Sequence, residues 1–255
     1  MIDLANQLLA ATEPHLRPAL LTFLRVAAAM ALLPAFGEQA IPVRLRLGLA
    51  LAFTALILPA VADRHSGDDL LLPAAAETVA GLLIGLSLRL MVMGLQMAAT
   101  IAAQSTSLSQ LFAGATVEPL PALGTLFTWA ALALAMQAGL HVKLTALFIA
   151  SHDLLPAGRF PAGEDIARWG TAQVAQVTGL GFSLALPFVL AGLLWNVALG
   201  AVNRAMPQLM MAFIGAPALA LGSLALTAMT APAILFLWLQ GFDAQVARPF
   251  AADPK

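Results

Sequence analysis

The chain has 255 residues, of which 61% are hydrophobic and only 10% are charged, whereas soluble domains carry about a quarter charged residues. Such an excess of apolar surface requires lipid or membrane-embedded protein around it, which argues against a soluble protein. A net charge of −1 argues against a nucleic-acid-binding protein, and the absence of cysteine excludes disulfides, thiolate nucleophiles and zinc–thiolate sites.

About six apolar segments follow one another along the chain, and each is predicted to be a helix. Their approximate bounds are residues 18–33, 47–62, 74–99, 123–150, 178–199 and 209–239. A helix needs about 20 apolar residues to cross the hydrocarbon core, so the first two are short. The fourth and sixth are long, and Pro217 and Pro232 are expected to interrupt the sixth. The pattern predicts an all-α membrane protein with helices buried against other protein.

The polar parts of the chain are short. The N-terminus lacks the basic region and cleavage site of a secretory signal, so the first apolar segment is expected to remain in the mature protein. The longest polar stretch, residues 151–173, is too short for a core of its own. We therefore expect one membrane-embedded domain over residues 1–255.

Arginines lie in two of the links between segments. Arg44 and Arg46 follow the proline-rich link at residues 34–42, and Arg204 precedes the last segment. If the segments alternate across the membrane, these arginines share one side, which the positive-inside rule predicts to be cytoplasmic.

Small and charged residues occur within the first and third apolar segments. Gly81 and Gly85 form a GxxxG pattern, which predicts close helix packing, either within the chain or with another subunit. Arg25 and Arg89 are expected to have protein partners, because an ionised side chain at membrane depth costs at least about 2.5–3.5 kcal/mol. Glu77 lies near a segment end and is expected to extend its carboxylate towards the boundary.

No enzyme motif stands out. The sequence has no GxxxxGK[ST], HExxH or GxSxG. Ser151, His152 and Asp153 are the residue types of a catalytic triad, but consecutive residues of a helix point in different directions. We predict no catalytic, cofactor or metal site.

The link between the third and fourth segments, residues 104–121, is polar but nearly uncharged. Leu108, Leu111 and Phe112 lie there among Ser, Thr, Gly and Ala. Such a segment is either a simple connector or a narrow hydrophobic constriction that closes a pore by dewetting.

Several motifs occur in a specific order and spacing. They are Phe23-Leu24-Arg25, Pro34, Phe36-Gly37, Pro42 and Arg44, then Glu77, Gly81 and Gly85, then Gly139 and His141, and finally Asn203-Arg204-Ala205-Met206-Pro207-Gln208 followed by Gly215 and Pro217. Together they resemble the FliR family of flagellar export-gate proteins and its virulence-secretion (SctT) relatives. The last motif is similar to the NRxxPQ…GxP signature of that family, and the resemblance extends over nearly the whole chain.

The resemblance implies an architecture and partners. It implies one copy in a hetero-oligomer with FliP-like and FliQ-like subunits, whose tilted, broken hairpins form a helical export-gate assembly. Residues 1–170 would be the FliP-like part and residues 171–255 the FliQ-like hairpin. The assembly would be a conduit for unfolded flagellar proteins in the basal body, in the bacterial inner membrane.

The resemblance also implies site residues. A plug loop at about residues 106–119 would close the channel, with Ser107, Leu108, Leu111, Phe112, Ala113 and Gly114 as its central residues. A turn that docks an FlhB-like protein would comprise Asn203, Arg204, Pro207, Gln208, Gly215 and Pro217. Arg25, Gly81 and Gly85, which belong to the resemblance, and Arg89, whose charge lies within an apolar segment, are expected to be buried polar and packing positions. The alternatives are a virulence injectisome homologue, which shares the fold, and a stand-alone secondary transporter, although nearly all acidic residues lie outside the segment centres.

Overall fold

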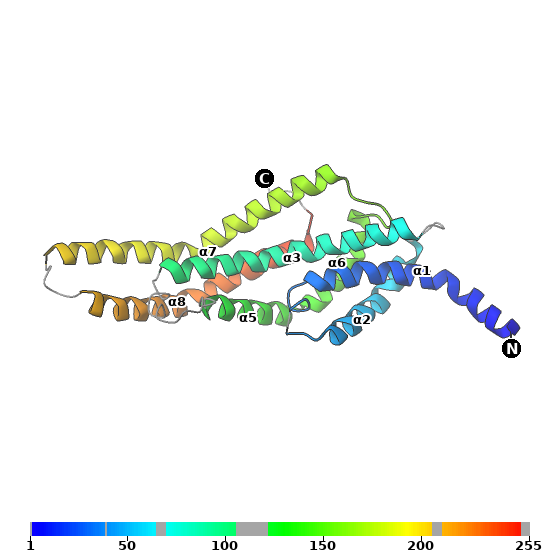
Figure 1. The fold of residues 1–255 in the computed structure, drawn as a ribbon, viewed down its shortest axis with the longest axis horizontal. Coiled ribbons are helices and arrows are strands. Elements are labelled where there is room, and N and C mark those ends of the chain that lie inside the picture. The colour runs from blue at the N-terminus through cyan, green and yellow to red at the C-terminus, as the bar shows by residue number, and fades with distance from the viewer. Residues whose placement is uncertain (1, 39, 65–69, 106–121, 206–210, 251–255) are drawn as a thin grey trace. The chain divides into compact units, whose positions relative to one another are not determined.

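The computed structural model describes residues 2–38, 40–64, 70–105, 122–205 and 211–250 of the chain. Within these ranges the structure is helical and contains no strand, which confirms the all-α prediction. The elements are α1 (Ile2–Leu32), α2 (Val43–Val61), the short 3₁₀ helix η1 (Ala62–Arg64), α3 (Leu71–Ser105), α5 (Ala122–Gln137), α6 (Leu140–Leu154), α7 (Gly163–Ala205) and α8 (Met211–Ala247) (Figure 1).

Four stretches in the described ranges are long and apolar enough to cross a membrane: Val43–Arg64, Leu71–Ser105, Gly163–Val202 and Leu221–Ala247. The fourth predicted segment is divided into α5 and α6, which meet at a bend of 74°. Gly139 lies in that bend with φ +80°, a conformation that ends a helix and suits glycine because it has no Cβ.

The two prolines that were expected to interrupt the last segment do not end its helix. The α8 helix continues through both Pro217 and Pro232. One proline removes one backbone hydrogen bond, and the bonds on either side hold the helix together.

The chain forms two compact units. Unit 1 comprises Met1–Leu90, Met136–Gln173 and Asp243–Lys255, and unit 2 comprises Met91–Ala135 and Val174–Phe242. The division at residue 170 into FliP-like and FliQ-like parts was inferred from the resemblance, and it remains a prediction.

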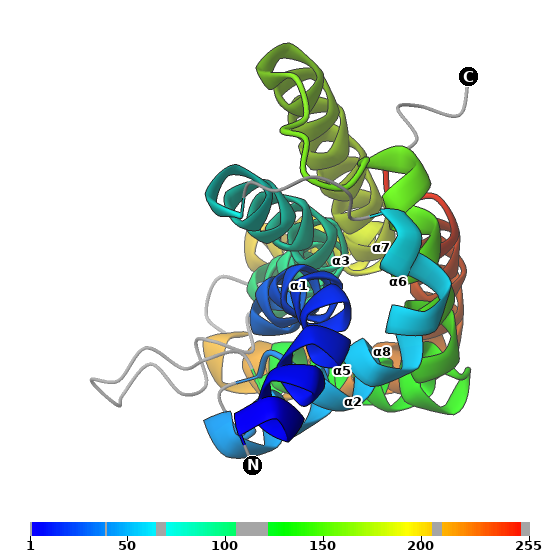
Figure 2. The same cartoon turned by 90° about the vertical axis from the view of Figure 1, so that its right-hand side faces the viewer.

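In unit 1, α1 lies along the first part of α3 (Figure 1), and α2 packs against α1 and α6 (Figure 2). Three aromatic rings connect these elements. Phe53 of α2 makes edge-to-face contacts with Phe36 before it and Phe148 of α6, with ring centroids 6.0 and 6.3 Å apart. Because Phe36 and Phe148 are buried, this contact holds α2 to the core of unit 1.

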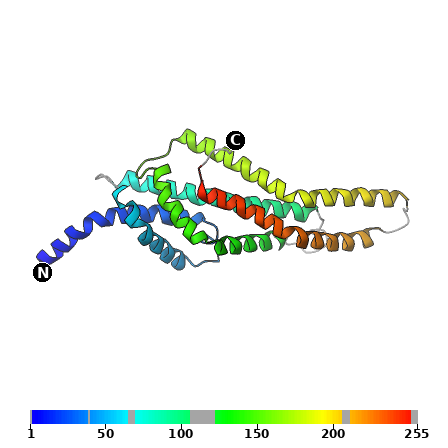
Figure 3. The ribbon, with the colours of Figure 1, turned by 180° about the vertical axis from the view of Figure 1, so that it is seen from behind.

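In unit 2, α7 and α8 run antiparallel (Figure 3), and both contact the second part of α3. A Cβ built on Gly94 would lie 2.7 Å from the Val177 side chain, so α3 and α7 approach closely here. The indole of Trp238, fully buried on α8, donates a hydrogen bond of 2.9 Å to the Met91 carbonyl of α3. A buried indole needs such a partner, so this bond fixes the position of α8 on α3.

Large apolar side chains remain exposed on several helices. Among them are Val43, Leu45, Leu47, Leu51 and Leu56 on α2, Phe182, Leu186, Leu190, Leu193, Leu194 and Val197 on α7, and Leu221, Leu224, Met229, Phe236 and Leu237 on α8. Patches of this extent mark surfaces that lipid or other protein covers.

Candidate functional site

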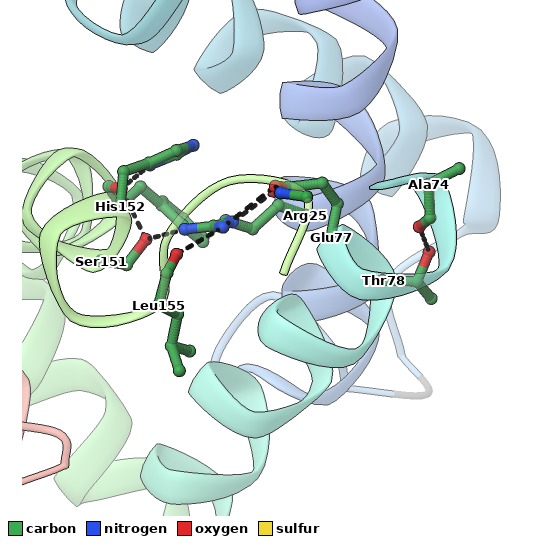
Figure 4. Close-up of polar contacts among 9 residues, drawn as sticks. Arg25, Ala74, Glu77, Thr78, Ser151, His152 and Leu155 are labelled. Atoms are coloured by element: carbon green, nitrogen blue, oxygen red, sulfur yellow. Dashed lines mark hydrogen bonds and ion pairs between the residues drawn. The ribbon is translucent and has the colours of Figure 1, made fainter. Parts of the chain in front are cut away.

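The most elaborate polar site in the described residues surrounds Arg25 in unit 1. The guanidinium is 1% exposed and forms a bidentate ion pair with Glu77 of α3, with Nε–Oε2 at 2.5 Å and Nη2–Oε1 at 3.1 Å. It also donates from Nη1 to the Ser151 hydroxyl of α6 at 3.0 Å and from Nη2 to the Leu155 carbonyl at 2.9 Å. These four bonds use four of the five guanidinium N–H donors. Figure 4 shows the guanidinium between Glu77 and the end of α6.

Glu77 is fully buried, so the expectation that its carboxylate reaches towards the membrane boundary is wrong. Its partner Arg25 lies on the facing helix. The ion pair with Arg25 replaces the hydrogen bonds that the carboxylate would otherwise make with water. The Gly158 amide also donates to Glu77 Oε1 at 3.0 Å. The pair therefore joins α1, α3, α6 and the loop after α6, four parts of the chain that are distant in sequence.

Such a network stabilises one arrangement of helices because each alternative would leave a buried group unpaired. Removing one partner of a buried ion pair costs about 3–5 kcal/mol. The Ser151 hydroxyl, which accepts from Arg25, donates to the Phe148 carbonyl at 2.7 Å. Every polar group named in this network thus has a partner, and the geometry of the end of α6 is specified.

The structure places Gly81 and Gly85 against α1 of the same chain. A Cβ on Gly81 would lie 2.1 Å from the Arg25 carbonyl oxygen, and one on Gly85 would lie 2.7 Å from that of Ala29. Only glycine permits backbones to approach so closely. The close approach brings Glu77, one turn before Gly81, within reach of Arg25.

Arg89 is placed half-buried, with 31% of its side chain exposed, and its Nη1 lies 2.5 Å from Glu38 Oε1. Glu38 belongs to the link between α1 and α2, so this ion pair attaches the link to α3. An ion pair with this exposure contributes about 0–1 kcal/mol, far less than the pair at Arg25.

The side chains of the Ser-His-Asp sequence diverge. Ser151 contacts Arg25, the His152 Nδ1 contacts the Phe148 carbonyl at 2.9 Å, and Asp153 pairs with Arg64. A catalytic triad needs the nucleophile, base and orienting carboxylate in one chain of hydrogen bonds, and these residues do not form one.

Comparison with known proteins identifies the family. The family described as bacterial export proteins, family 1, matches residues 16–245. This range contains Arg25, Glu77 and Ser151. The chain belongs to this family.

Three relatives are each described as flagellar biosynthetic protein FliR. The chain is 32% identical to that of Caulobacter vibrioides over 89% of this chain and 94% of the relative. It is 29% identical to that of Escherichia coli K12 over 76% of both chains, and 26% identical to that of Bacillus subtilis over 78% and 80%. The likeness extends over both compact units.

The plug residues and part of the family turn lie outside the described residues. Ser107, Leu108, Leu111, Phe112, Ala113, Gly114, Pro207 and Gln208 belong to this group. Asn203 and Arg204 belong to the end of α7, and Gly215 and Pro217 belong to α8. The roles predicted for these residues therefore remain predictions.

Sequence reasoning missed Ser151 and the Leu155 carbonyl as partners of Arg25. The signal for Ser151 was weak: a polar residue near the end of an apolar segment is common. For a backbone carbonyl there is no sequence signal, because every residue carries one.

Proposed function

We infer that this chain is a component of the flagellar type III protein export apparatus. The observation that carries the inference is the likeness to FliR proteins over nearly the whole chain, 89% of it for the Caulobacter relative, together with membership of the bacterial export family. The apolar helices fit a membrane-embedded component. In this role the chain acts as a structural part of the apparatus.

We propose more specifically that the chain is a single subunit of an export gate in the bacterial inner membrane, within the flagellar basal body. Its partners would be FliP-like and FliQ-like subunits and an FlhB-like protein, and its cargo would be unfolded flagellar proteins. The exposed apolar side chains of α7 and α8 support this proposal. These side chains are not covered by the rest of the chain, so neighbouring subunits can bind there.

Native mass spectrometry of the tagged chain, co-expressed with FliP-like and FliQ-like proteins encoded beside it, tests the assembly. The expected result is one copy of this chain in a multi-subunit complex. Expression without the FliP-like protein is the control, and the complex should then be lost. A stable monomer or homodimer that ignores these partners would contradict the proposal and favour a stand-alone transporter.

We propose that residues 106–119 form a plug that closes the channel, with Ser107, Leu108, Leu111, Phe112, Ala113 and Gly114 at its centre. Apolar side chains there would exclude water while the small residues give room for movement. The turn with Asn203, Arg204, Pro207 and Gln208, followed by Gly215 and Pro217, would be the docking element for the FlhB-like subunit.

Deleting residues 107–114 is expected to leave the complex assembled but permeable to ions, because the apolar constriction is removed while the helices on either side remain. Single-channel conductance of the purified complex in planar bilayers measures this. Deletion of residues 65–69, a polar stretch of the sequence between η1 and α3, is the control. An assembled plug mutant with unchanged conductance would show that the segment is only a connector.

The buried carboxylate of Glu77 is less consistent with a proton-coupled transporter than with a structural subunit. In such a protein an intramembrane carboxylate faces a water-filled path. Glu77 is instead 0% exposed and held by Arg25 and Gly158, the arrangement of a structural ion pair.

A further inference from the structure

Two cavities in unit 1 adjoin at the loop between α6 and α7. One has a volume of about 620 Å³, and Arg64, His152 and Arg159 line it. The other has a volume of about 420 Å³, and its walls include Leu83, Leu154, Phe160, Ile166, Trp169 and Phe250. Pro156 and Arg159 line both cavities, so a polar and an apolar cavity share one wall.

The polar cavity is cationic. Among the described residues that line it, Arg64 and Arg159 are charged and none is acidic. Among the described residues, Arg64 pairs with Asp153, and this contact uses one of its five N–H donors. The Arg159 side chain makes no hydrogen bond or ion pair within the described part of the chain. A pair of guanidinium groups beside a cavity is the arrangement that binds phosphate.

The neighbouring cavity suits an aliphatic chain. Leu154 and Phe160 are 54% and 51% exposed, so its apolar wall lacks a covering within the described residues. Asp165, the acidic residue that lines this cavity, is paired with Arg168 at 2.7 Å. Covering such a wall with hydrocarbon gains about 25 cal/mol for each Å² removed from water.

The wall between the cavities is preformed. Gly158 adopts φ +71°, and a Cβ there would lie 3.3 Å from Pro73 at the start of α3. Its amide is bonded to the buried Glu77 at 3.0 Å. The ion pair of Arg25 and Glu77 therefore holds the loop that positions Arg159.

We propose that the two cavities form one binding site for an anionic phospholipid, with the phosphate between Arg64 and Arg159 and an acyl chain in the apolar cavity. Basic pockets on membrane proteins bind anionic head groups in this way. Four helices in the described residues are apolar enough to cross a membrane, so phospholipid is available to the chain, and the apolar cavity beside the two arginines favours a lipid over a free phosphate. The proposal does not depend on the export function.

Native mass spectrometry of the purified full chain with dioleoyl phosphatidylglycerol or dioleoyl phosphatidylcholine tests the site. We expect phosphatidylglycerol to be retained at least tenfold more than phosphatidylcholine, which has the same acyl chains but a zwitterionic head group. Arg159→Ala, alone or with Arg64→Ala, should reduce retention about tenfold. Arg159 has no side-chain partner in the described residues, so this substitution leaves the fold intact, as the thermal midpoint will verify.

The matched control is Arg44→Ala, which removes the same charge from an exposed position outside both cavities and should leave retention unchanged. Phe160→Ser tests the apolar half and should also reduce retention about tenfold. Equal retention of the two lipids, or unchanged retention in Arg159→Ala, would overturn the site. Complete displacement of the lipid by millimolar glycerol 3-phosphate, with no effect of Phe160→Ser, would overturn the lipid in favour of a free phosphate.

Discussion

Replacing Arg25 with leucine is expected to abolish both stable folding and flagellar protein export. The substitution leaves the Glu77 carboxylate buried without its bidentate partner, and it removes the donors to Ser151 and the Leu155 carbonyl. The cost is about 3–5 kcal/mol, a large fraction of the total stability of most proteins. The thermal midpoint in detergent and the amount of secreted flagellar protein measure the two effects.

Two further variants make this test specific. Arg89→Leu removes the same charge from the half-buried pair with Glu38, and its cost should be only about 0–1 kcal/mol. The double replacement Arg25→Leu with Glu77→Leu should recover much of the stability lost in the single one, because apolar residues can replace a buried ion pair at little cost. If Arg25→Leu melted at the wild-type temperature, the network would have no structural role. If the double variant were as unstable as the single one, charge burial would not be the cause.

Gly81→Ala is the second substitution with a large expected effect. Its Cβ would lie 2.1 Å from the Arg25 carbonyl oxygen and 3.0 Å from the Ala28 side chain, so α1 and α3 must separate. Overpacking of this kind costs about 1–3 kcal/mol and sometimes more. The separation also lengthens the bonds between Arg25 and Glu77. We expect a lower thermal midpoint and reduced recovery of the assembled complex.

Gly179→Ala is the matched control, since Gly179 is also helical but a Cβ there meets nothing within 4 Å. Alanine favours a helix over glycine by about 1 kcal/mol, so this control should be neutral or stabilising. Equal behaviour of the two variants would mean that α1 and α3 tolerate separation, and the close packing would then have no importance for stability.

The plug and the family turn could be assigned from the sequence only in part. Their residues were assigned by resemblance, and most of them lie outside the described residues, so their roles depend on the conductance and assembly experiments. The polar site at Arg25 was only half predicted. Its apolar surroundings indicated that Arg25 needs a partner, but they could not say which one.

The sequence by itself determined the class of the protein. The apolar excess, which indicates a membrane protein, is a property of composition. The all-α fold follows because in lipid a helix can satisfy its backbone hydrogen bonds within one segment. Neither the membrane class nor the helical fold therefore requires knowledge of contacts between segments. The family motifs are likewise local and ordered along the chain. Membership of the export family could therefore be predicted from residues alone.

Only the tertiary structure decided which groups meet. Arg25 and Glu77 are 52 positions apart, and Arg25 and Ser151 are 126 apart. Their pairing depends on how closely α1 and α3 approach at Gly81. Because Glu77 lies near the end of its segment, the sequence predicted that its carboxylate reaches the membrane boundary. Whether the side chain is buried depends instead on the helix that faces it. The packing of helices distant in sequence, which no local pattern encodes, made that carboxylate part of the core.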